Sequence, residues 1–216
     1  MARPSQTGFF DGPAGPLQTL VDEPEELRAL ALVAHPHPLL GGTNANKVVY
    51  TLAHCLRDLG CLALRPNFRG VGRSAGTHDH GIGETDDLLA VLTQARRRWP
   101  ASESLPVVLA GFSFGAYVQT RVASRLLAAG RPPARVILVA LAVGPVGEAW
   151  PYQPEPVPAG SILIHGDRDT TVPMANVLGY AEPLNLPVTV IPGADHFFHG
   201  RLQLIREIIK ADWRLP

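Results

Sequence analysis

The sequence has little cysteine, no excess of charge and no long apolar run. Cys55 and Cys61 are its two cysteines, and their places on a predicted helix and the next strand favour buried free thiols over a disulfide. The 19 basic and 19 acidic residues cancel, which gives no electrostatic reason to expect nucleic acid or an anionic membrane as partner. Because no leader pattern and no run of transmembrane length is present, we expect a soluble, cytoplasmic protein.

What the sequence does contain is an alternation of short apolar runs with longer amphipathic stretches. Six runs have the length and apolar content of buried parallel strands, namely Ala29–Ala34, Cys61–Arg65, Pro106–Ala110, Arg135–Leu141, Ser161–His165 and Val188–Ile191. Four other stretches have helical periodicity, namely Asn46–Leu59, Gly83–Trp99, Gly115–Ala129 and Arg201–Trp213. This order predicts the α/β class, with a doubly wound, mostly parallel sheet, in a single domain over residues 1–216.

Two segments depart from this alternation. Residues 9–17 are rich in turn-forming residues and predict a hairpin of antiparallel strands at the N-terminal edge of the sheet. The segment Gly144–Gly160 lies between two predicted strands and contains five prolines. We therefore expect a meandering loop there and no cap domain.

The pattern Gly-x-Ser-x-Gly occurs twice, around Ser113 and around Ser74. A nucleophilic serine in this pattern stands on a sharp turn between a strand and a helix, where its Oγ is exposed at the edge of the sheet. Ser113 follows an apolar run and precedes a helical stretch, whereas Ser74 lies between loop residues. The context therefore favours Ser113 as nucleophile and a structural role for Ser74.

A serine nucleophile needs a base, and the base needs an acid that orients it. Two later loops supply these residue types in the order that such a fold requires, acid before histidine. The first loop contains Asp167 and Asp169, and the second contains His196, with His199 close to the last helix. Position within the loop favours His196 over His199. The residues alone leave both aspartates open, although Asp167 also suits a turn or capping role.

Five segments follow one another across nearly the whole chain: Ala34–Thr43 with His-Pro-His-Pro and Gly-Gly-Thr, Asn67–Gly72, Gly111–Gly115, His165–Asp169 and Gly193–Gly200. In these segments the chain resembles the α/β-hydrolase superfamily, and within it a group of small bacterial serine hydrolases without a lid. The resemblance implies the α/β-hydrolase fold, Asp169 as the acid and His196 as the base.

Backbone N–H groups near the nucleophile are expected to stabilise the oxyanion of the reaction. One should come from Phe114, directly after the nucleophile, and another from the loop after the first long parallel strand. Prolines in that loop have no N–H, so His37 is the first suitable donor past His35, with Leu39 and Leu40 next, and the resemblance also favours His37. Apolar residues near these positions are candidates for binding the substrate, namely Leu39, Leu40 and Phe112.

We expect these residues to cleave an acyl bond, most simply a carboxylic ester of a small molecule, through an acyl-serine and without a cofactor. Thioesters and small amides or peptides are alternative substrates, and a homodimer is left open. A zinc site built on His35, His37, His78 and His80 is a competing hypothesis, although it ignores the order of serine, acid and histidine. A dinucleotide site at Gly70–Ala75 lacks the helix it requires. An inactive binding protein on the same scaffold is the alternative outside enzymes.

Overall fold

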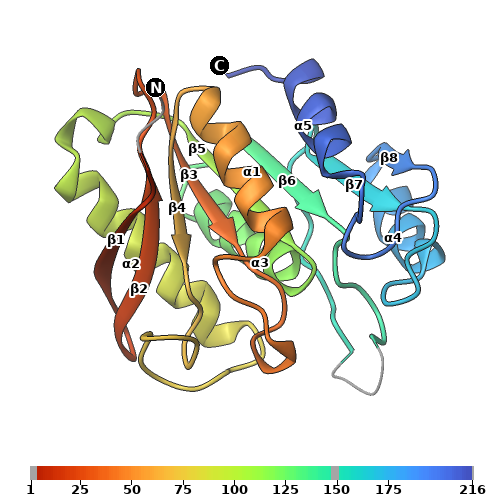
Figure 1. Cartoon of the computed structure of the whole chain (residues 1–216), viewed down its shortest axis with the longest axis horizontal. Helices are drawn as coiled ribbons and strands as arrows, with labels where there is room; N and C mark the ends of the chain where they lie inside the picture. Colours follow the sequence, from red (N-terminus) through yellow and green to blue (C-terminus); the bar gives the residue numbers. More distant parts are fainter. Residues whose placement is uncertain (1–3, 147–150, 216) are drawn as a thin grey trace.

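The chain folds around one sheet of eight strands with helices on both faces (Figure 1). The computed structural model describes residues 4–146 and 151–215. Within these residues the strands lie in the order β1-β2-β4-β3-β5-β6-β7-β8. Their bounds are β1 (Gln6–Gly12), β2 (Gly15–Asp22), β3 (Ala29–Ala34), β4 (Cys61–Pro66), β5 (Val107–Phe112), β6 (Arg135–Val139), β7 (Ile162–Gly166) and β8 (Val188–Ile191). The six neighbouring strands β4, β3, β5, β6, β7 and β8 are parallel to one another. This arrangement confirms the expected α/β class.

Each face of the sheet is covered by its own helices and has its own apolar core. The helices α1 (Lys47–Asp58) and α5 (Leu202–Ala211) pack on one face. The helices α2 (Ile82–Arg98), α3 (Phe114–Ala128) and α4 (Met174–Ala181) pack on the other. Helices on both faces bury both sides of the parallel strands, which is why these strands are apolar at nearly every position.

The N-terminal hairpin forms the expected antiparallel edge. β1 pairs with β2, and β2 pairs antiparallel with β4. A buried ion pair joins the hairpin to the parallel part of the sheet, since Arg65 Nε lies 2.8 Å from Asp22 Oδ2. The two buried charges compensate each other. The guanidinium also donates a hydrogen bond to the backbone carbonyl of Asn44.

Three of the differences from the expected elements concern β6, β5 and α4. β6 ends at Val139, two residues early, because Ala140 has a positive φ of 45° and turns the chain away from the sheet. β5 continues two residues past Ala110. The sequence does not predict the helix α4, because Val177 and Ala181 are its only fully buried residues and it has no long apolar stripe.

The cysteines and the segment Gly144–Gly160 can also be compared with the sequence predictions. Cys55 and Cys61 are both free and buried, as predicted. The described part of Gly144–Gly160 forms one bridge between Gly144 and Tyr152 and no helix, while residues 147–150 lie outside the described residues. No described helix combines the length and apolarity needed to cross a membrane.

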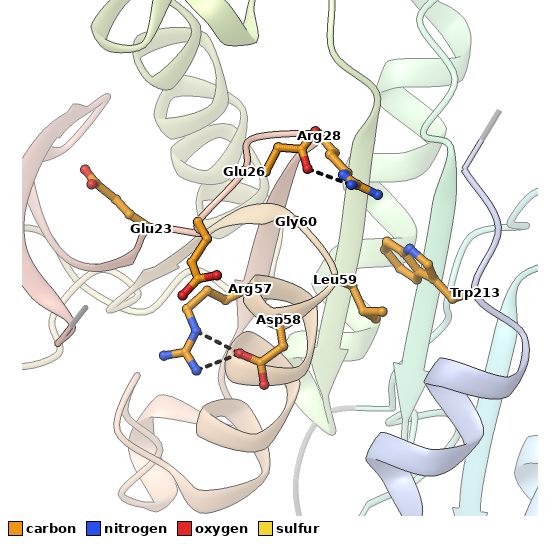
Figure 2. A pocket seen from close by; sticks show the side chains of 9 residues that line it. Glu23, Glu26, Arg28, Arg57, Asp58, Leu59, Gly60 and Trp213 are labelled. Carbon is orange, nitrogen blue, oxygen red and sulfur yellow. Dashed lines mark hydrogen bonds and ion pairs between the residues drawn. The ribbon is translucent and has the colours of Figure 1, made fainter. Parts of the chain in front are cut away.

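The two ends of the sheet differ in chemistry. A hollow of about 520 Å³ lies at the amino ends of β3 and β4, lined by acidic side chains, Trp213 and the ion pairs Arg28–Glu26 and Arg57–Asp58 (Figure 2). None of its described lining residues is a serine, cysteine or histidine. The residues suited to nucleophilic chemistry lie at the opposite, carboxyl end of the strands.

Candidate active site

Ser113 stands on the sharp turn between β5 and α3, with a positive φ of 55°. Close backbone contacts explain the glycines on either side. A Cβ on Gly111 would lie 2.5 Å from the carbonyl carbon of Gly115, and one on Gly115 would lie 2.3 Å from the carbonyl oxygen of Ala34. Side chains at either position would force the turn apart, so glycine is required where the turn packs against β3.

Three loops at the carboxyl ends of β5, β7 and β8 bring Ser113, Asp169 and His196 together. Ser113 Oγ lies 3.1 Å from His196 Nε2, and His196 Nδ1 lies 2.7 Å from Asp169 Oδ2. All three residues are buried, with less than a tenth of each exposed. When a carboxylate contacts an imidazole and the imidazole contacts a serine hydroxyl, the imidazole can take the hydroxyl proton and make the serine oxygen nucleophilic.

Asp169 is held by the backbone of its own loop. Its Oδ1 accepts the N–H groups of Thr171 and Val172, each at 2.8 Å. Burial alone would raise its pKa, but the hydrogen bond from His196 and the backbone donors outweigh burial and hold the pKa of Asp169 below its usual value. The carboxylate is therefore charged at neutral pH and able to orient the imidazole.

A second buried histidine, His165, lies behind this carboxylate at the end of β7. Its Nε2 lies 2.9 Å from the carbonyl oxygen of Val172 and 3.6 Å from Asp169 Oδ2. Burial lowers the pKa of His165, so the ring is neutral and donates this N–H to Val172. His165 belongs to the segment His165–Asp169, but the sequence alone predicts no role for it. Its signal is a histidine four residues before the acid, at the end of a buried strand.

The alternative residues from the sequence lie elsewhere. His199 pairs with Asp195 at the surface, and 71% of its side chain is exposed. Asp167 Oδ1 accepts the N–H of Gly193, which joins the two loops. Ser74 Oγ donates to the carbonyl of Asn67 and accepts an N–H from the N-terminal hairpin. The structure gives each of these three side chains a structural partner away from the Ser113 hydroxyl.

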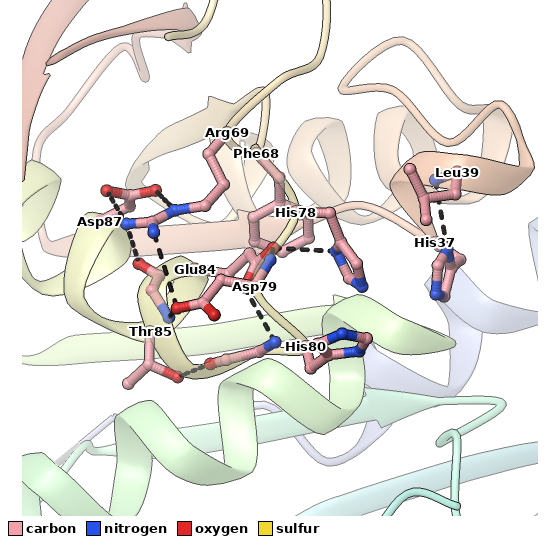
Figure 3. Close-up of polar contacts among 12 residues, drawn as sticks. His37, Leu39, Phe68, Arg69, His78, Asp79, His80, Glu84, Thr85 and Asp87 are labelled. Atoms are coloured by element: carbon pink, nitrogen blue, oxygen red, sulfur yellow. Dashed lines mark hydrogen bonds and ion pairs between the residues drawn. The ribbon is translucent and has the colours of Figure 1, made fainter. Parts of the chain in front are cut away.

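The loop after β3 has one N–H group that could serve as an oxyanion donor. The N–H of Leu39 donates to His37 Nδ1 (Figure 3). The N–H of Leu40 donates to the carbonyl of His37. Among these three residues, only His37 has a backbone N–H with no acceptor in the part of the chain described. Phe114 begins α3, so its N–H has no carbonyl one helical turn earlier to bond. Both groups suit an oxyanion.

The histidines of the zinc hypothesis are engaged in other contacts. His35 Nε2 accepts the N–H of Phe68 at 2.9 Å, and its Nδ1 lies 2.7 Å from the carbonyl oxygen of Pro36. His78 Nδ1 lies 2.9 Å from the carboxylate of Glu84 (Figure 3). Within residues 4–146 and 151–215 no three His, Cys, Asp or Glu side chains converge as metal ligands do.

The loop that carries the loose dinucleotide pattern also lacks the context that such a site needs. The glycines at 70 and 72 lead into further loop residues, and the next helix begins only at Ile82. A dinucleotide fingerprint places its last glycine at the start of the helix that binds the pyrophosphate. The segment instead packs against the N-terminal hairpin, where Ala75 donates its N–H to the carbonyl of Pro16.

A hollow of about 100 Å³ opens beside Ser113, and it reaches one of the three predicted substrate residues. Leu40 lines it, whereas Leu39 does not. Phe112 is fully buried, in a tilted ring contact with His196 and an edge contact with Phe197, so it has no exposed surface for the substrate contact that the sequence predicts. As the last residue of β5 it faces the core beneath α1 and α5. Phe197 lines the hollow, and its signal in the sequence is an aromatic residue directly after the base.

Comparison with known proteins decides the family. An α/β serine hydrolase homologue from Coxiella burnetii is 37% identical, with a TM-score of 0.82 over 99% of this chain and 100% of that one. The chain belongs to the α/β serine hydrolases. A lidless member from Xanthomonas campestris is 38% identical, with a TM-score of 0.83 over 100% of this hydrolase and 98% of that protein.

Two further matches add detail. An uncharacterized protein of Rickettsia prowazekii (strain Madrid E) is 34% identical to the hydrolase over 206 residues, which is 90% of this chain and 83% of that protein. A family model described as a thioesterase domain matches residues 67–150. That match includes Ser113 and ends before Asp169 and His196. The hydrolase therefore shares its nucleophile region with this model, while the full fold is that of the lidless serine hydrolases.

Proposed function

We propose that this hydrolase cleaves carboxylic esters through an acyl-serine intermediate, with Ser113, His196 and Asp169 as its catalytic residues. The observation that supports the proposal is the unbroken series of contacts from Ser113 Oγ through His196 to Asp169. In the first step the Ser113 oxygen attacks the ester carbonyl while His196 Nε2 takes its proton. Asp169 accepts the Nδ1–H of His196 and keeps the imidazole in the tautomer that this transfer needs.

The tetrahedral intermediate then loses the alcohol. The N–H groups of Phe114 and His37 stabilise its oxyanion, each by roughly 3 kcal/mol if they behave as such donors do elsewhere. The imidazolium of His196 protonates the departing alcohol, which leaves the acyl-serine. Water attacks this ester by the same steps in reverse, and His196 returns the proton to Ser113.

Thioesters are a second candidate substrate, favoured by the thioesterase model that matches residues 67–150. The same triad serves both bonds, because a thiolate needs less help from His196 to leave than an alkoxide does. Rates on a matched ester and thioester with the same acyl group separate the two. A kcat/KM at least tenfold higher on the thioester would favour thioester hydrolysis as the main activity.

We also propose that the hydrolase works in the cytoplasm. Its two cysteines are buried as free thiols, and reducing compartments keep such thiols unpaired.

The central test compares the two serines of the repeated pattern. A fluorophosphonate probe and p-nitrophenyl acetate are applied to wild type, Ser113→Ala and Ser74→Ala. We expect Ser113→Ala to lose labelling and to lose activity by about 10⁴-fold or more. Ser74→Ala should keep both once the folded fraction is matched. Wild-type protein that neither labels nor turns over any ester would overturn the proposal and leave the binding-protein alternative.

A further inference from the structure

The lining of the hollow beside Ser113 includes a tight turn and an aromatic ring. The turn after β3 is held by hydrogen bonds from Gly41 to Pro38 and from Gly42 to His37. Its packing is tight, because a Cβ on Gly42 would lie 2.1 Å from the carbonyl oxygen of Pro36. The wall formed by this turn is therefore in place before any substrate binds.

A second part of the lining is the side chain of Phe197. It contacts the rings of His196, at 5.1 Å between centroids, and Phe112, at 5.9 Å. Although it contacts these two rings, Phe197 is 47% exposed, and Leu40, which also lines the hollow, is 77% exposed. Together the two apolar side chains offer a surface beside the nucleophile that a ligand can cover.

The lining also indicates which part of an ester the hollow receives. The leaving alcohol must lie against His196 Nε2, which protonates it, and His196 is not among the described residues that line the hollow. Ser113 and His37 do line it, so a group attached to the carbonyl carbon points into it when the oxygen faces the His37 N–H. The hollow therefore suits the acyl group and not the alcohol.

The volume of the hollow and the charge of its lining limit which acyl groups it can accept. A cavity of about 150 Å³ accepts benzene with its six carbons, so the 100 Å³ here takes about four. The described lining contains no Asp, Glu, Lys or Arg. The side-chain oxygen Oδ1 of Asn46 already accepts the N–H groups of Val48 and Val49 as the cap of α1. An uncharged aliphatic chain fits these surroundings.

We propose that Leu40 and Phe197 form the walls of an acyl site in this hydrolase that selects uncharged aliphatic acyl groups of up to about four carbons. This inference rests on the proposed ester hydrolysis. Each methylene buried between the two walls should raise kcat/KM about fourfold. The rise should stop once the chain extends beyond the hollow.

The chain offers a matched control in adjacent leucines. Leu39 is 72% exposed, close to the exposure of Leu40, and lies outside the lining. Wild type, Leu40→Ala, Phe197→Ala and Leu39→Ala are assayed on p-nitrophenyl acetate, propionate, butyrate, hexanoate and octanoate. We expect wild type and Leu39→Ala to gain about fourfold per methylene up to butyrate. In Leu40→Ala and Phe197→Ala the gain should fall below about twofold, because one wall is missing.

A second series varies the alcohol of acetate esters on the same four proteins. Its profile across alcohols should not change in Leu40→Ala or Phe197→Ala. An altered alcohol profile with an unaltered acyl profile would overturn the assignment, as would an equal effect of Leu39→Ala. In these outcomes the hydrolase still cleaves esters and labels at Ser113, so the acyl site fails while the proposed function stands. Absence of both turnover and labelling would instead mean that the function fails.

Discussion

Two aspartates lie two residues apart in the loop after β7, and their surroundings give them different chemistry. Asp169 is buried, receives two backbone N–H groups and contacts His196. Asp167 is exposed and accepts one N–H from Gly193 in the neighbouring loop. A carboxylate can orient the base only where it reaches the imidazole, so one of the two is expected to matter for turnover.

Asp169→Asn should lower kcat on p-nitrophenyl acetate about 10⁴-fold, because an amide at this position favours the wrong tautomer of His196. Asp167→Asn makes the same chemical change two residues away. Its amide oxygen can still accept the Gly193 N–H, so kcat should stay within about twofold of wild type. Steady-state kinetics on both purified variants, with circular dichroism to confirm folding, makes the comparison. Equal losses in the two variants would contradict the role proposed for Asp169.

Individual residues of the site differ in how well the sequence identifies them. Ser113 can be distinguished from Ser74 because a strand and a helix are visible on either side of it. Asp169 and Asp167 differ only in the direction of their side chains within one loop, which residue type does not reveal; the family resemblance was needed to choose. The prediction that Phe112 contacts substrate fails for a related reason. Side chains alternate between the two faces of a strand, and the sequence does not reveal which face of β5 Phe112 is on.

At the scale of elements, the start of α2 depends on one buried carboxylate. Glu84 accepts the N–H of Asp79 at 2.9 Å and that of Gly81 at 2.8 Å (Figure 3). It also faces His78, whose ring lies 4.8 Å from that of His37. The carboxylate therefore holds the loop before α2 beside the loop of His37, the proposed oxyanion donor.

Glu84→Ala should lower the free energy of unfolding by about 3 kcal/mol, because it leaves two backbone N–H groups without their acceptor. Glu84→Gln keeps one carbonyl oxygen in place and should lose roughly half as much. Urea denaturation followed by circular dichroism measures both. If the alanine and glutamine variants were equally stable, the hydrogen bonds to Glu84 would not hold this loop.

Elements differ in how far sequence predicts them. The helix α1 has a capping residue, Asn46, and seven buried residues along one face, so its periodicity is strong. The helix α4 has eight residues with two of them buried, and a glycine at 179. It is stabilised where the connection between β7 and β8 packs back onto the sheet. Such a helix depends on tertiary contacts that a local pattern does not contain.

At the scale of the whole molecule, four fully or partly buried histidines have pKa values below their usual range. Burial lowers the pKa of His35 to about 3 and that of His37 to about 4, and it lowers the pKa of His54 and His165 as well. In the unfolded chain each would titrate near 6.5. Between its folded and unfolded pKa, each histidine binds a proton in the unfolded state and not in the folded state. The contribution of these histidines to the free energy of unfolding is therefore complete above about pH 6.5 and falls as the pH is lowered.

His35 gives the clearest test of this coupling, because its ring is fully buried and both of its nitrogens are hydrogen-bonded. Lowering the pH from 7.5 to 5.5 should cost about 1.4 kcal/mol through His35 alone. Urea unfolding at the two pH values measures the total loss, and His35→Asn should reduce that loss by about this amount. His199→Gln, at an exposed histidine, serves as the control and should leave the loss unchanged. Should His35→Asn not fold, the His35 ring in wild type can be followed by NMR. A ring that titrates near pH 6.5 in the folded protein would show that burial does not hold it neutral.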